Sequence, residues 1–304
     1  MSPRVSVIMA TYDREQFLRA AVESVLGQTF ADFEFLIVDD GSREPARAVL
    51  RGYAAADRRV RPIFLAHSGI PSAVRNAAIR IARGDYVAFI DSDDAWTSDK
   101  LARQLAALAA APGRRWSYTA CLHIDERGRR FAPAGVEPWR AHRGRILDSV
   151  ACLRAHAALP SIMVERALLL EAGSFDESLP LFEDHDLWLR LASRSDVVVI
   201  EEALLEVRRH GAHYSGSDAL AVLEYRERFL GRAAGFALSA DACRELRRVR
   251  ATNLARLACA RARAGERRAA FASLRASMGS GWRYARWWIE AARCVATPAR
   301  SARA

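Results

Sequence analysis

Apolar runs alternate with helical patterns along the first 120 residues. Continuous runs rich in β-branched residues predict strands that are buried on both faces, and they lie at residues 4–10, 33–42, 60–66, 85–91 and 114–120. Between them, apolar residues recur at helical spacing, which predicts helices over residues 14–28, 44–56, 70–84 and 98–110. Pro71 near the start and Gly84 past the end are typical boundaries of the third helix.

This alternation predicts an α/β fold, a mostly parallel sheet with helices on both faces, because parallel strands need helical crossovers. Ligands of such sheets bind beyond the carboxyl ends of the strands. Three of the strands end in polar sequences, which are ATYD at 10–13, VDDGS at 38–42 and DSDD at 91–94. We therefore expect these clusters to meet at one edge of the sheet, and that edge is the candidate site.

The pattern is looser after residue 120. Residues 121–144 are rich in Gly, Pro and Arg and predict a hairpin or lid. A strand at 161–166, a helix at 181–195 and a strand at 197–211 follow, and the sequence is helical from about residue 215. We therefore place a boundary near 212–218 and expect two domains, residues 1–212 and a helical extension over 213–304.

Charge is concentrated in the predicted extension. The chain has a net charge of +10, with 28 basic against 29 acidic residues over 1–210 and 18 against 7 over 211–304. Such an excess is typical of solvated helix faces, or of a basic surface for nucleic acid or an anionic membrane. Nearly all of the basic residues are arginines, with Lys100 as the only lysine, and biased codon usage would produce the same composition.

Residues 282–296 combine tryptophans with arginines. Trp282, Trp287, Trp288 and Ile289 alternate there with basic side chains. This pattern suits the interface of an anionic bilayer, and it equally suits a helix that packs on its own domain. No nucleic-acid module is recognisable, so we expect no nucleic-acid partner and leave peripheral membrane contact open.

The cysteines and the apolar content bear on the cellular compartment. The five cysteines are odd in number and lack C-x-x-C spacing, which argues against a disulfide framework or a zinc site and for a reducing compartment. The start of the chain has too short an apolar run for a signal peptide, and no stretch approaches the roughly 18 apolar residues of a membrane span. We expect a cytoplasmic protein, peripheral at the inner face of the membrane if the extension binds lipid.

The segment AFIDSDDAW places three carboxylates within four positions at a strand end. Adjacent carboxylates repel one another and lower the stability of the fold, so their presence together calls for an explanation. Mg²⁺ or Mn²⁺ is usually held by one or two carboxylates plus substrate phosphates. We therefore expect Asp91, Asp93 and Asp94 to serve a divalent cation that a diphosphate completes. The alternative, capping of the next helix, is weaker because Ser98 and Asp99 are better placed to cap it.

Three blocks, residues 5–42, 75–96 and 182–192, resemble the inverting family 2 glycosyltransferases of GT-A fold. They fall in that family's order and cover roughly residues 4–210. A lone D-x-D motif would be weak, but the ordered set is specific. The resemblance implies a donor-binding half over 1–120 and an acceptor and catalytic half over 121–212.

The same resemblance implies a donor site for a nucleotide sugar. Its residues would be Ala10, Thr11, Tyr12, Asp13, Asp40, Arg75 and Asp91. Tyr12 would stack on the nucleobase, Asp40 would bind the base edge, and Asp91 would hold the ribose. The family more often has Asn at the place of Asp13, which leaves that role open. From the residues alone, Tyr12 covering the sheet edge, a turn at Asp40 and an ordinary ion pair of Arg75 remain alternatives.

The resemblance further implies a metal at Asp93, with Asp94 and His210 as further ligands. His210 equally suits a structural role. Glu183 would contact acceptor hydroxyls, and Asp184 would be the general base.

Helical spacing supports Asp184, because it lies three and four residues before Leu187 and Trp188 and shares their inward face. Asp186 lies on another side, four residues before Arg190, where an ion pair is expected. Compensation of the helix dipole is the alternative role for Asp184.

We therefore expect a metal-dependent, non-processive hexosyltransferase that moves a sugar, by default from a UDP-sugar, to a hydroxyl of a glycan or lipid-linked acceptor. Cell-envelope or exopolysaccharide synthesis is the expected context. A sugar nucleotidyltransferase would need a Gly-rich loop where this chain has ATYDREQF. A binding protein that keeps the donor pocket without turnover is the second alternative, and the presence of both Asp184 and the DSDD segment disfavours it.

Overall fold

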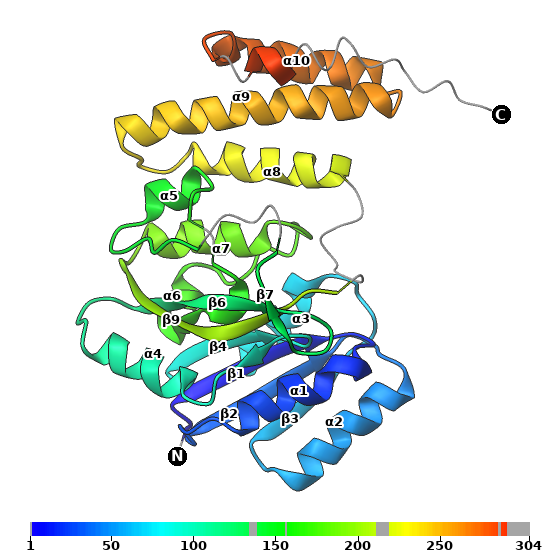
Figure 1. Ribbon diagram of the computed structural model, residues 1–304, viewed down its shortest axis with the longest axis vertical. Coiled ribbons are helices and arrows are strands. Elements are labelled where there is room, and N and C mark those ends of the chain that lie inside the picture. Colours follow the sequence, from blue (N-terminus) through cyan, green and yellow to red (C-terminus); the bar gives the residue numbers. More distant parts are fainter. Residues whose placement is uncertain (1, 134–138, 156, 211–218, 285–286, 291–304) are drawn as a thin grey trace, which may run out of the picture. The chain divides into compact units, whose positions relative to one another are not determined.

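The computed structural model describes residues 2–133, 139–155, 157–210, 219–284 and 287–290. Two compact units divide the chain (Figure 1). The first comprises residues 1–146 and 155–212, and the second comprises 147–154 and 213–304. The boundary expected at 212–218 lies entirely outside the described residues, and the split of the chain into domains 1–212 and 213–304 stays a prediction.

In the described residues, nine strands form one sheet in the first unit, in the order β3-β2-β1-β4-β8-β6-β9-β5 with β7 paired to β6. The strands are β1 (Val5–Thr11), β2 (Phe33–Asp39), β3 (Val60–Phe64), β4 (Tyr86–Asp91), β5 (Ala95–Trp96), β6 (Trp116–Ile124), β7 (Arg130–Phe131), β8 (Met163–Glu165) and β9 (Val197–Arg208). β1 to β4 run parallel, and β8 joins β4 to β6 in antiparallel fashion. The sheet is therefore parallel where the donor site is expected and mixed beyond it.

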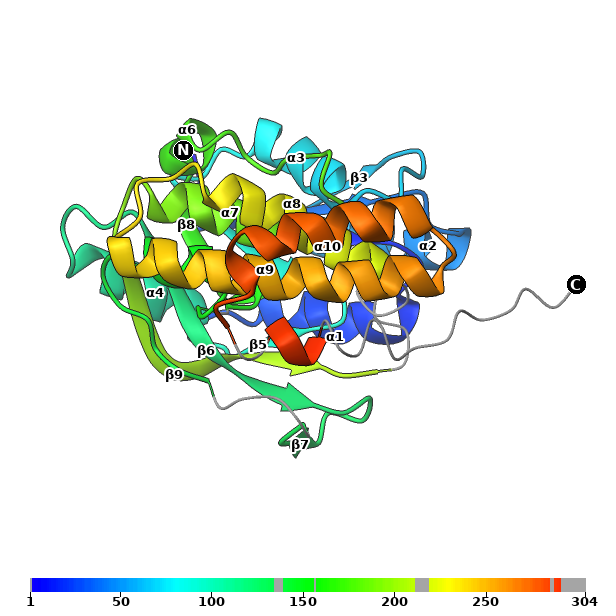
Figure 2. The ribbon, with the colours of Figure 1, turned by 90° about the horizontal axis from the view of Figure 1, so that it is seen from above.

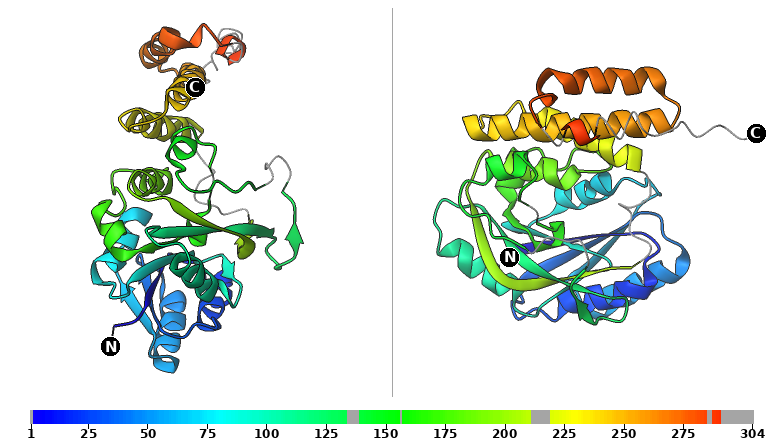
Figure 3. Two further views of the ribbon diagram at one scale, coloured as in Figure 1. Left: turned by 90° about the vertical axis from the view of Figure 1, so that its left-hand side faces the viewer. Right: turned by 45° about the horizontal axis from the view of Figure 1, so that its top comes forward.

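Helices cover both faces of this sheet. They are α1 (Glu15–Leu26), α2 (Glu44–Ala56), α3 (Pro71–Ile81), α4 (Lys100–Ala109), α6 (Arg166–Glu171) and α7 (Glu183–Ala192), with a 3₁₀ turn η1 (Leu159–Ser161). Right-handed crossovers place α1 and α2 on one face of the parallel strands and α3 on the other, because β4 returns to the far side of β1 (Figure 3). Each helix buries the apolar stripe that its sequence predicts, as Leu18, Val22 and Val25 do in α1.

The parallel register brings the three polar strand ends together. Thr11 pairs with Asp39 and Ala10 pairs with Asp91, so the predicted convergence at one edge is confirmed. The glycine past α3 serves close packing, because a Cβ on Gly84 would clash with the backbone of Ser6.

Several short elements were not predicted from the sequence. β5, α6 and α5 (Leu147–Ala151) have two, six and five residues, too few to show a period. The expected cap of α4 is also wrong in its detail. Asp99 stands at the N-cap without a side-chain capping bond and instead accepts from the Thr97 hydroxyl and pairs with Arg103.

The second unit is helical, with α8 (Ala219–Ala233), α9 (Ala240–Arg263) and α10 (Arg267–Gly281) besides α5. α10 packs along α9 (Figure 2), and Ser239 caps α9 by accepting from the Ala242 N–H at 3.2 Å. In the described residues, no helix is both long and apolar enough to cross a membrane.

Candidate active site at the carboxyl edge of the sheet

The carboxylates that follow β4 occupy three different environments. Asp91 pairs with Arg75 at 3.0 Å. Asp93 lies 2.9 Å from Nε2 of His210. Asp94 is buried and accepts from the backbone N–H of Arg208 at 2.9 Å. The three predicted metal or ribose ligands are therefore neighbours. Asp91 is held from α3, and Asp93 and Asp94 are held from the end of β9 and the residues just after it.

This cluster carries more negative charge than the protein balances. Burial raises the pKa of Asp91, and the charge of Asp93 adds to the effect although Arg75 opposes it. Burial also raises the pKa of Asp94 well above its usual range, with the charges of Asp91 and Asp93 as further causes. Such a cluster is a candidate functional site, because carboxyl groups with pKa values raised by burial and by each other's charges concentrate at functional sites.

The end of β9 clamps the DSDD segment. Nε of Arg208 donates to the carbonyl of Asp93, and its Nη1 donates to the carbonyl of Asp125. His210, whose side chain is almost fully buried, lies 4.9 Å from the ring of Phe17. The structure thus brings His210 to the predicted metal ligand, whereas Arg208 was not singled out in the sequence, since nothing distinguishes it from Arg209 beside it.

The residues present fit a divalent cation that is shared with a ligand. Among the residues that the structure describes, no group of three His, Cys, Asp or Glu side chains is placed to hold a metal by itself. Asp93 supplies a carboxylate beside the buried Asp94 and the imidazole of His210. One or two such ligands are what Mg²⁺ takes from a protein when phosphates complete its shell.

Arg75 connects the acidic strand end to helix α7. It is buried in α3, and its two terminal nitrogens reach Asp91 at 3.0 Å and Glu183 at 3.1 Å. Arg75 therefore pairs with acids, as the alternative from the sequence held, but inside the site and not on the surface. Burial raises the pKa of Glu183 to about 7, with the charge of Asp184 adding and that of Arg75 opposing.

Asp184 is held ionised by its neighbour. Burial alone would raise its pKa, but the charge of His185 and its hydrogen bonds outweigh this, and the pKa of Asp184 is lowered. The backbone N–H of His185 donates to Oδ1 of Asp184 at 2.7 Å, and Nδ1 of the same residue lies 2.8 Å from that oxygen. The side chain of Asp184 remains 27% exposed, so it is accessible from the rim.

Helix α7 is more completely buried than the periodicity predicts. Leu187, Trp188 and Leu191 are buried as expected, but so are Leu189 and Asp186. The predicted pair of Asp186 with Arg190 is confirmed at 2.8 Å, in a buried setting. The helical face on which each residue lies therefore does not distinguish the roles of Asp184 and Asp186. Their partners do, because Asp184 contacts His185 and Asp186 pairs with Arg190.

Two strained residues border the rim. In the described chain, four residues other than glycine have a left-handed backbone, and two of them are Asp13 with φ 46° and Phe182 with φ 64°. Phe182 immediately precedes α7 and so sets the direction in which Glu183 and Asp184 leave the turn. Strain of this kind concentrates at functional sites.

The remaining predicted donor residues lie at the ends of β1 and β2. Tyr12 is 45% exposed, and the ring of His67 stacks on it at 4.1 Å. Asp40 is buried and accepts from the backbone N–H groups of Ser68 and Gly69. A loop after β3 therefore orients Asp40 and covers one face of Tyr12. Sequence reasoning missed His67, because it lies in an unpatterned loop.

Thr11 and Asp13 complete this part of the rim. Thr11 is buried, and its hydroxyl oxygen has no hydrogen-bond partner in the described residues, which suits a polar ligand. Asp13 pairs with Arg43 and accepts from its backbone N–H, and that hydrogen bond is the main cause that lowers the pKa of Asp13. Asp39, in contrast with Asp40, is structural. It is fully buried, accepts a hydrogen bond from the N–H of Ser42 and pairs with the partly exposed Arg47 at 2.9 Å.

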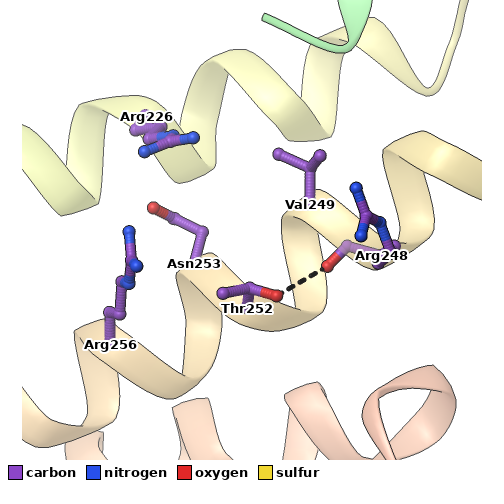
Figure 4. A pocket seen from close by; sticks show the side chains of 6 residues that line it. All are labelled: Arg226, Arg248, Val249, Thr252, Asn253 and Arg256. Atoms are coloured by element: carbon purple, nitrogen blue, oxygen red, sulfur yellow. Dashed lines mark hydrogen bonds between the residues drawn. The ribbon is translucent and has the colours of Figure 1, made fainter. Parts of the chain in front are cut away.

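A cavity of about 110 Å³ lies away from this rim, in the helical unit between α8 and α9 (Figure 4). It is lined by Arg226, Arg248, Val249, Thr252, Asn253 and Arg256. Arg248 and Arg256 are paired with Glu245 and Glu290. The cavity contains none of the predicted site residues and so forms no part of the candidate active site.

Comparisons with known proteins agree with the residue pattern. The family described as Glycosyl transferase family 2 matches residues 6–149. An uncharacterized glycosyltransferase of Methanocaldococcus jannaschii, MJ1057, is 32% identical over 209 residues, which is 68% of this chain and 71% of that protein. A glycosyltransferase of Rickettsia felis is 33% identical over 68% of this chain, and the O-antigen biosynthesis protein RfbC of Myxococcus xanthus is 31% identical over 69% of it. The matched segments span only 33% and 16% of these two relatives.

Solved structures share the fold. Staphylococcus aureus TarS 1–349 in complex with UDP-GlcNAc superposes with a TM-score of 0.67 at 19% identity, covering 93% of this chain and 92% of that one. The mannosyltransferase PcManGT of Pyrobaculum calidifontis, in complex with GDP-Man and Mn²⁺, gives a TM-score of 0.59 at 16% identity, covering 97% and 85%. The predicted GT-A architecture with C-terminal helices is therefore confirmed.

Proposed function

The chain belongs to the family 2 glycosyltransferases, and we propose that it moves a sugar from a nucleotide-diphosphate donor to a hydroxyl acceptor with inversion at the anomeric carbon. One observation carries this proposal. The acidic strand end at residues 91–94 gathers negative charge that the protein balances only in part, and Arg75 links it to Glu183, the neighbour of Asp184 in α7.

The donor would lie across the ends of β1, β2 and β4. The free face of Tyr12, which is opposite His67, is available to stack on a nucleobase. The fixed carboxylate of Asp40 accepts hydrogen bonds at about twice the strength of a neutral acceptor, which suits the N–H of a base. Asp91 would accept from the ribose hydroxyls, and UDP is the proposed nucleotide. TarS and PcManGT were solved with UDP-GlcNAc and GDP-Man respectively.

Asp93, Asp94 and His210 would hold Mg²⁺ or Mn²⁺. When bound, the ion draws charge from the diphosphate and makes it a better leaving group. The protein prepares for this by clamping the DSDD segment through Arg208, which fixes the carbonyl of Asp93 and the carboxylate of Asp94. The mannosyltransferase PcManGT was solved with Mn²⁺.

Asp184 would act as the general base. It would remove the proton of the acceptor hydroxyl while the acceptor oxygen attacks the anomeric carbon from the side opposite the diphosphate. Its lowered pKa keeps it ionised at neutral pH, so it is ready to accept a proton. Glu183, with a pKa of about 7, can donate to or accept from acceptor hydroxyls.

We place the acceptor among cell-envelope glycans or lipid-linked sugars, and the reaction in the cytoplasm, as a single transfer per binding event. The relative RfbC is named for O-antigen biosynthesis. The acceptor site would involve the segments after β6, which include residues 134–138 outside the described range.

The experiment that tests the proposal is hydrolysis and transfer with UDP-, dTDP- and GDP-sugars in the presence and absence of Mn²⁺. The proposal expects Mn²⁺-dependent release of one nucleoside diphosphate, and a product of inverted configuration when an acceptor is supplied. Tight donor binding without any release would instead favour the non-catalytic binding protein, and release of pyrophosphate from a nucleoside triphosphate would favour nucleotidyl transfer.

A further inference from the structure

The helical unit exposes large apolar side chains on one stretch of the chain. In the described residues, ten large apolar side chains are exposed, and five of them fall between 271 and 289. They are Phe271, Met278, Trp282, Trp288 and Ile289, each at least 52% exposed. Isolated exposed apolar residues are ordinary, but a local concentration marks an interaction surface.

Helical spacing places part of this set in a single row. Phe271, Arg275 and Met278 stand at i, i+4 and i+7 of α10, and Trp282 follows at i+11 just past the helix end, so they share one face. The other face of α10 packs on α9 through small residues, with Ser273 and Ser277 buried. The row is therefore the outward face of a helix that is already fixed to its unit.

The structure separates the tryptophans that the sequence groups together. Trp287 is buried against Ala251 and Ala255, and its ring N–H donates to the Ser277 hydroxyl at 2.9 Å. α10 ends at Gly281, where a Cβ would clash with the Trp287 ring. Residues 282–284 are not helical. The helix expected over 282–296 is therefore wrong in its first residues. Trp282 and Trp288 remain exposed, although the Trp288 ring lies edge-on against Trp287 at 4.9 Å and its N–H donates to the Trp282 carbonyl at 2.9 Å.

The same stretch is strongly basic. Residues 267–289 contain five arginines and no acidic residue. The guanidinium of Arg283 lies 5.0 Å from the centre of the Trp282 ring, and Arg268 and Arg275 are exposed on α10. Glu290, the first acid that follows, is buried and paired with Arg256, so it does not neutralise the exposed face.

We propose that the exposed face of this segment, formed by Arg268, Phe271, Arg275, Met278, Trp282 and Arg283, binds the surface of a bilayer that contains anionic phospholipid. The exposed Trp288, with Ile289 next to it in the chain, extends this face, because the Trp288 ring N–H donates to the Trp282 carbonyl. Aromatic and aliphatic side chains enter the acyl boundary while arginines pair with lipid phosphates. Both the apolar side chains and the arginines of the face then have a binding partner. The proposal is independent of the transferase assignment, because vesicle binding requires neither donor nor acceptor.

Two other occupants are less compatible with the face. A symmetric dimer would bring the same patch of each copy together, and arginines would then oppose arginines without an acid between them. A nucleic acid would pair with the arginines and stack on the tryptophans, but it would leave Phe271, Met278 and Ile289 without apolar contact. An anionic bilayer satisfies the charge and the apolar area together.

The test is co-sedimentation of the full chain with vesicles of phosphatidylcholine alone and with about one third phosphatidylglycerol. We expect binding only to the anionic vesicles. The variant Phe271→Ser/Met278→Ser/Trp282→Ser and the variant Arg275→Gln/Arg283→Gln should each lower the partition coefficient by about tenfold or more.

Matched controls remove the same chemistry elsewhere. Ile81→Ser/Leu170→Ser removes two exposed apolar residues from the first unit, and Arg244→Gln/Arg247→Gln removes two exposed arginines from α9. Both should bind as the wild type does. Circular dichroism melting and donor hydrolysis confirm that each variant is folded.

Three outcomes would overturn the proposal. The first is no sedimentation of the wild type with anionic vesicles. The second is binding that depends on the arginines but is unchanged in the Phe271→Ser/Met278→Ser/Trp282→Ser variant, which would indicate charge adsorption without insertion. The third is a concentration-dependent dimer, detected by light scattering, that this variant abolishes while wild-type vesicle binding is absent.

Discussion

At the amino end of β2, Glu34 is buried, and the protein supplies every partner that its charge needs. The Ser6 hydroxyl and the N–H of Arg83 each donate to it at 2.8 Å, and the side chains of Arg61 and Arg83 pair with it. Burial would raise the pKa of Glu34, but these hydrogen bonds outweigh it and the pKa is lowered. At the carboxyl end of the same sheet, Asp94 is equally buried, yet its neighbours are Asp91 and Asp93, and its pKa is raised.

The difference shows which edge of the sheet is arranged for stability and which for a ligand. Arginines are abundant in this chain, so a further arginine beside residues 91–94 could have balanced these carboxylates. Instead, Arg75 pairs with Asp91 and Glu183. Arg208 gives Asp94 a backbone N–H hydrogen bond, and the charge of its guanidinium only partly offsets burial and the charges of Asp91 and Asp93. A buried charge that is left unbalanced costs stability, and natural proteins retain such costs chiefly where function needs them.

The largest expected effect lies at the carboxyl edge. Asp184→Asn removes the proposed proton acceptor while keeping its shape, so turnover should fall by about 10²–10⁴-fold. Donor binding, measured by calorimetry, should be unchanged. Wild-type turnover in this variant would remove Asp184 from the mechanism.

Asp186→Asn is the matched control for that substitution, two residues along the same helix. Asp186 pairs with Arg190 at 2.8 Å, and the proposed mechanism gives it no role. Its loss should lower the free energy of unfolding by about 1–3 kcal/mol, with turnover per folded molecule unchanged.

The amino edge should respond in the opposite way. Glu34→Gln removes the charge that Arg61 and Arg83 share, and we expect the free energy of unfolding to fall by about 1–3 kcal/mol. The loss stays moderate because both arginines are partly exposed and can be hydrated. Urea denaturation measures it, and donor hydrolysis should not change. A loss of activity without a loss of stability would contradict the structural role of this edge.

Asp94→Asn sharpens the comparison with a predicted change of sign. The amide oxygen can still accept from Arg208, while repulsion from Asp91 and Asp93 is relieved. The free energy of unfolding should therefore stay the same or rise by up to about 1 kcal/mol, and Mn²⁺-dependent turnover should fall. Destabilisation as large as that of Glu34→Gln would mean that both edges are structural.

The smallest effect concerns a buried amine at the start of α4. Lys100 is fully buried, donates to Gln104 at 2.7 Å and lies 3.9 Å from the Trp96 ring centre. Burial lowers its pKa well below the usual value. The unfolded chain therefore binds a proton that the folded chain has released, so stability rises with pH up to about 10.4, the ordinary lysine pKa.

Lys100→Met should remove this rise. Urea denaturation between neutral pH and pH 10 measures the slope, and an unchanged slope in the variant would show that Lys100 does not cause it. The contrast with Glu34 is informative, because Lys100 is a buried titratable group with a neutral hydrogen-bond partner, Gln104, whereas Glu34 pairs with the charged Arg61 and Arg83.

The sequence predicts which strand ends meet at the site. The helical and strand hydrophobic periods locate the elements, and the carboxyl ends of parallel strands lie at one edge of the sheet. Thr11, Asp39 and Asp91 become neighbours once β1, β2 and β4 are known to be parallel. The periods do not show which of two adjacent acids turns inward. Asp39 is fixed by Ser42 and Arg47, while Asp40 is fixed by the loop after β3, and that loop has no pattern.

Long-range contacts account for the other differences. Arg208 reaches Asp93 across more than a hundred residues, and only the pairing of β9 with β6 places it there. Trp287 differs from Trp282 and Trp288 by packing against α9 and by its hydrogen bond to Ser277 of α10. Composition treats these residues alike, so their roles depend on tertiary structure.

The central claim is that the acidic strand end is balanced by a divalent ion shared with a diphosphate. Asp57, which follows α2 and pairs with Arg59 just before β3, supplies a control carboxylate at the amino edge. The most direct test is the thermal stability of the wild type, Asp93→Asn and Asp57→Asn with UDP, dTDP or GDP, each with and without Mn²⁺. Binding to the folded state raises the melting temperature by mass action. We predict that one nucleotide stabilises the wild type and Asp57→Asn strongly only with Mn²⁺, and that Asp93→Asn loses this Mn²⁺ dependence. Equal responses of Asp93→Asn and the wild type, or no Mn²⁺ effect with any nucleotide, would contradict the claim.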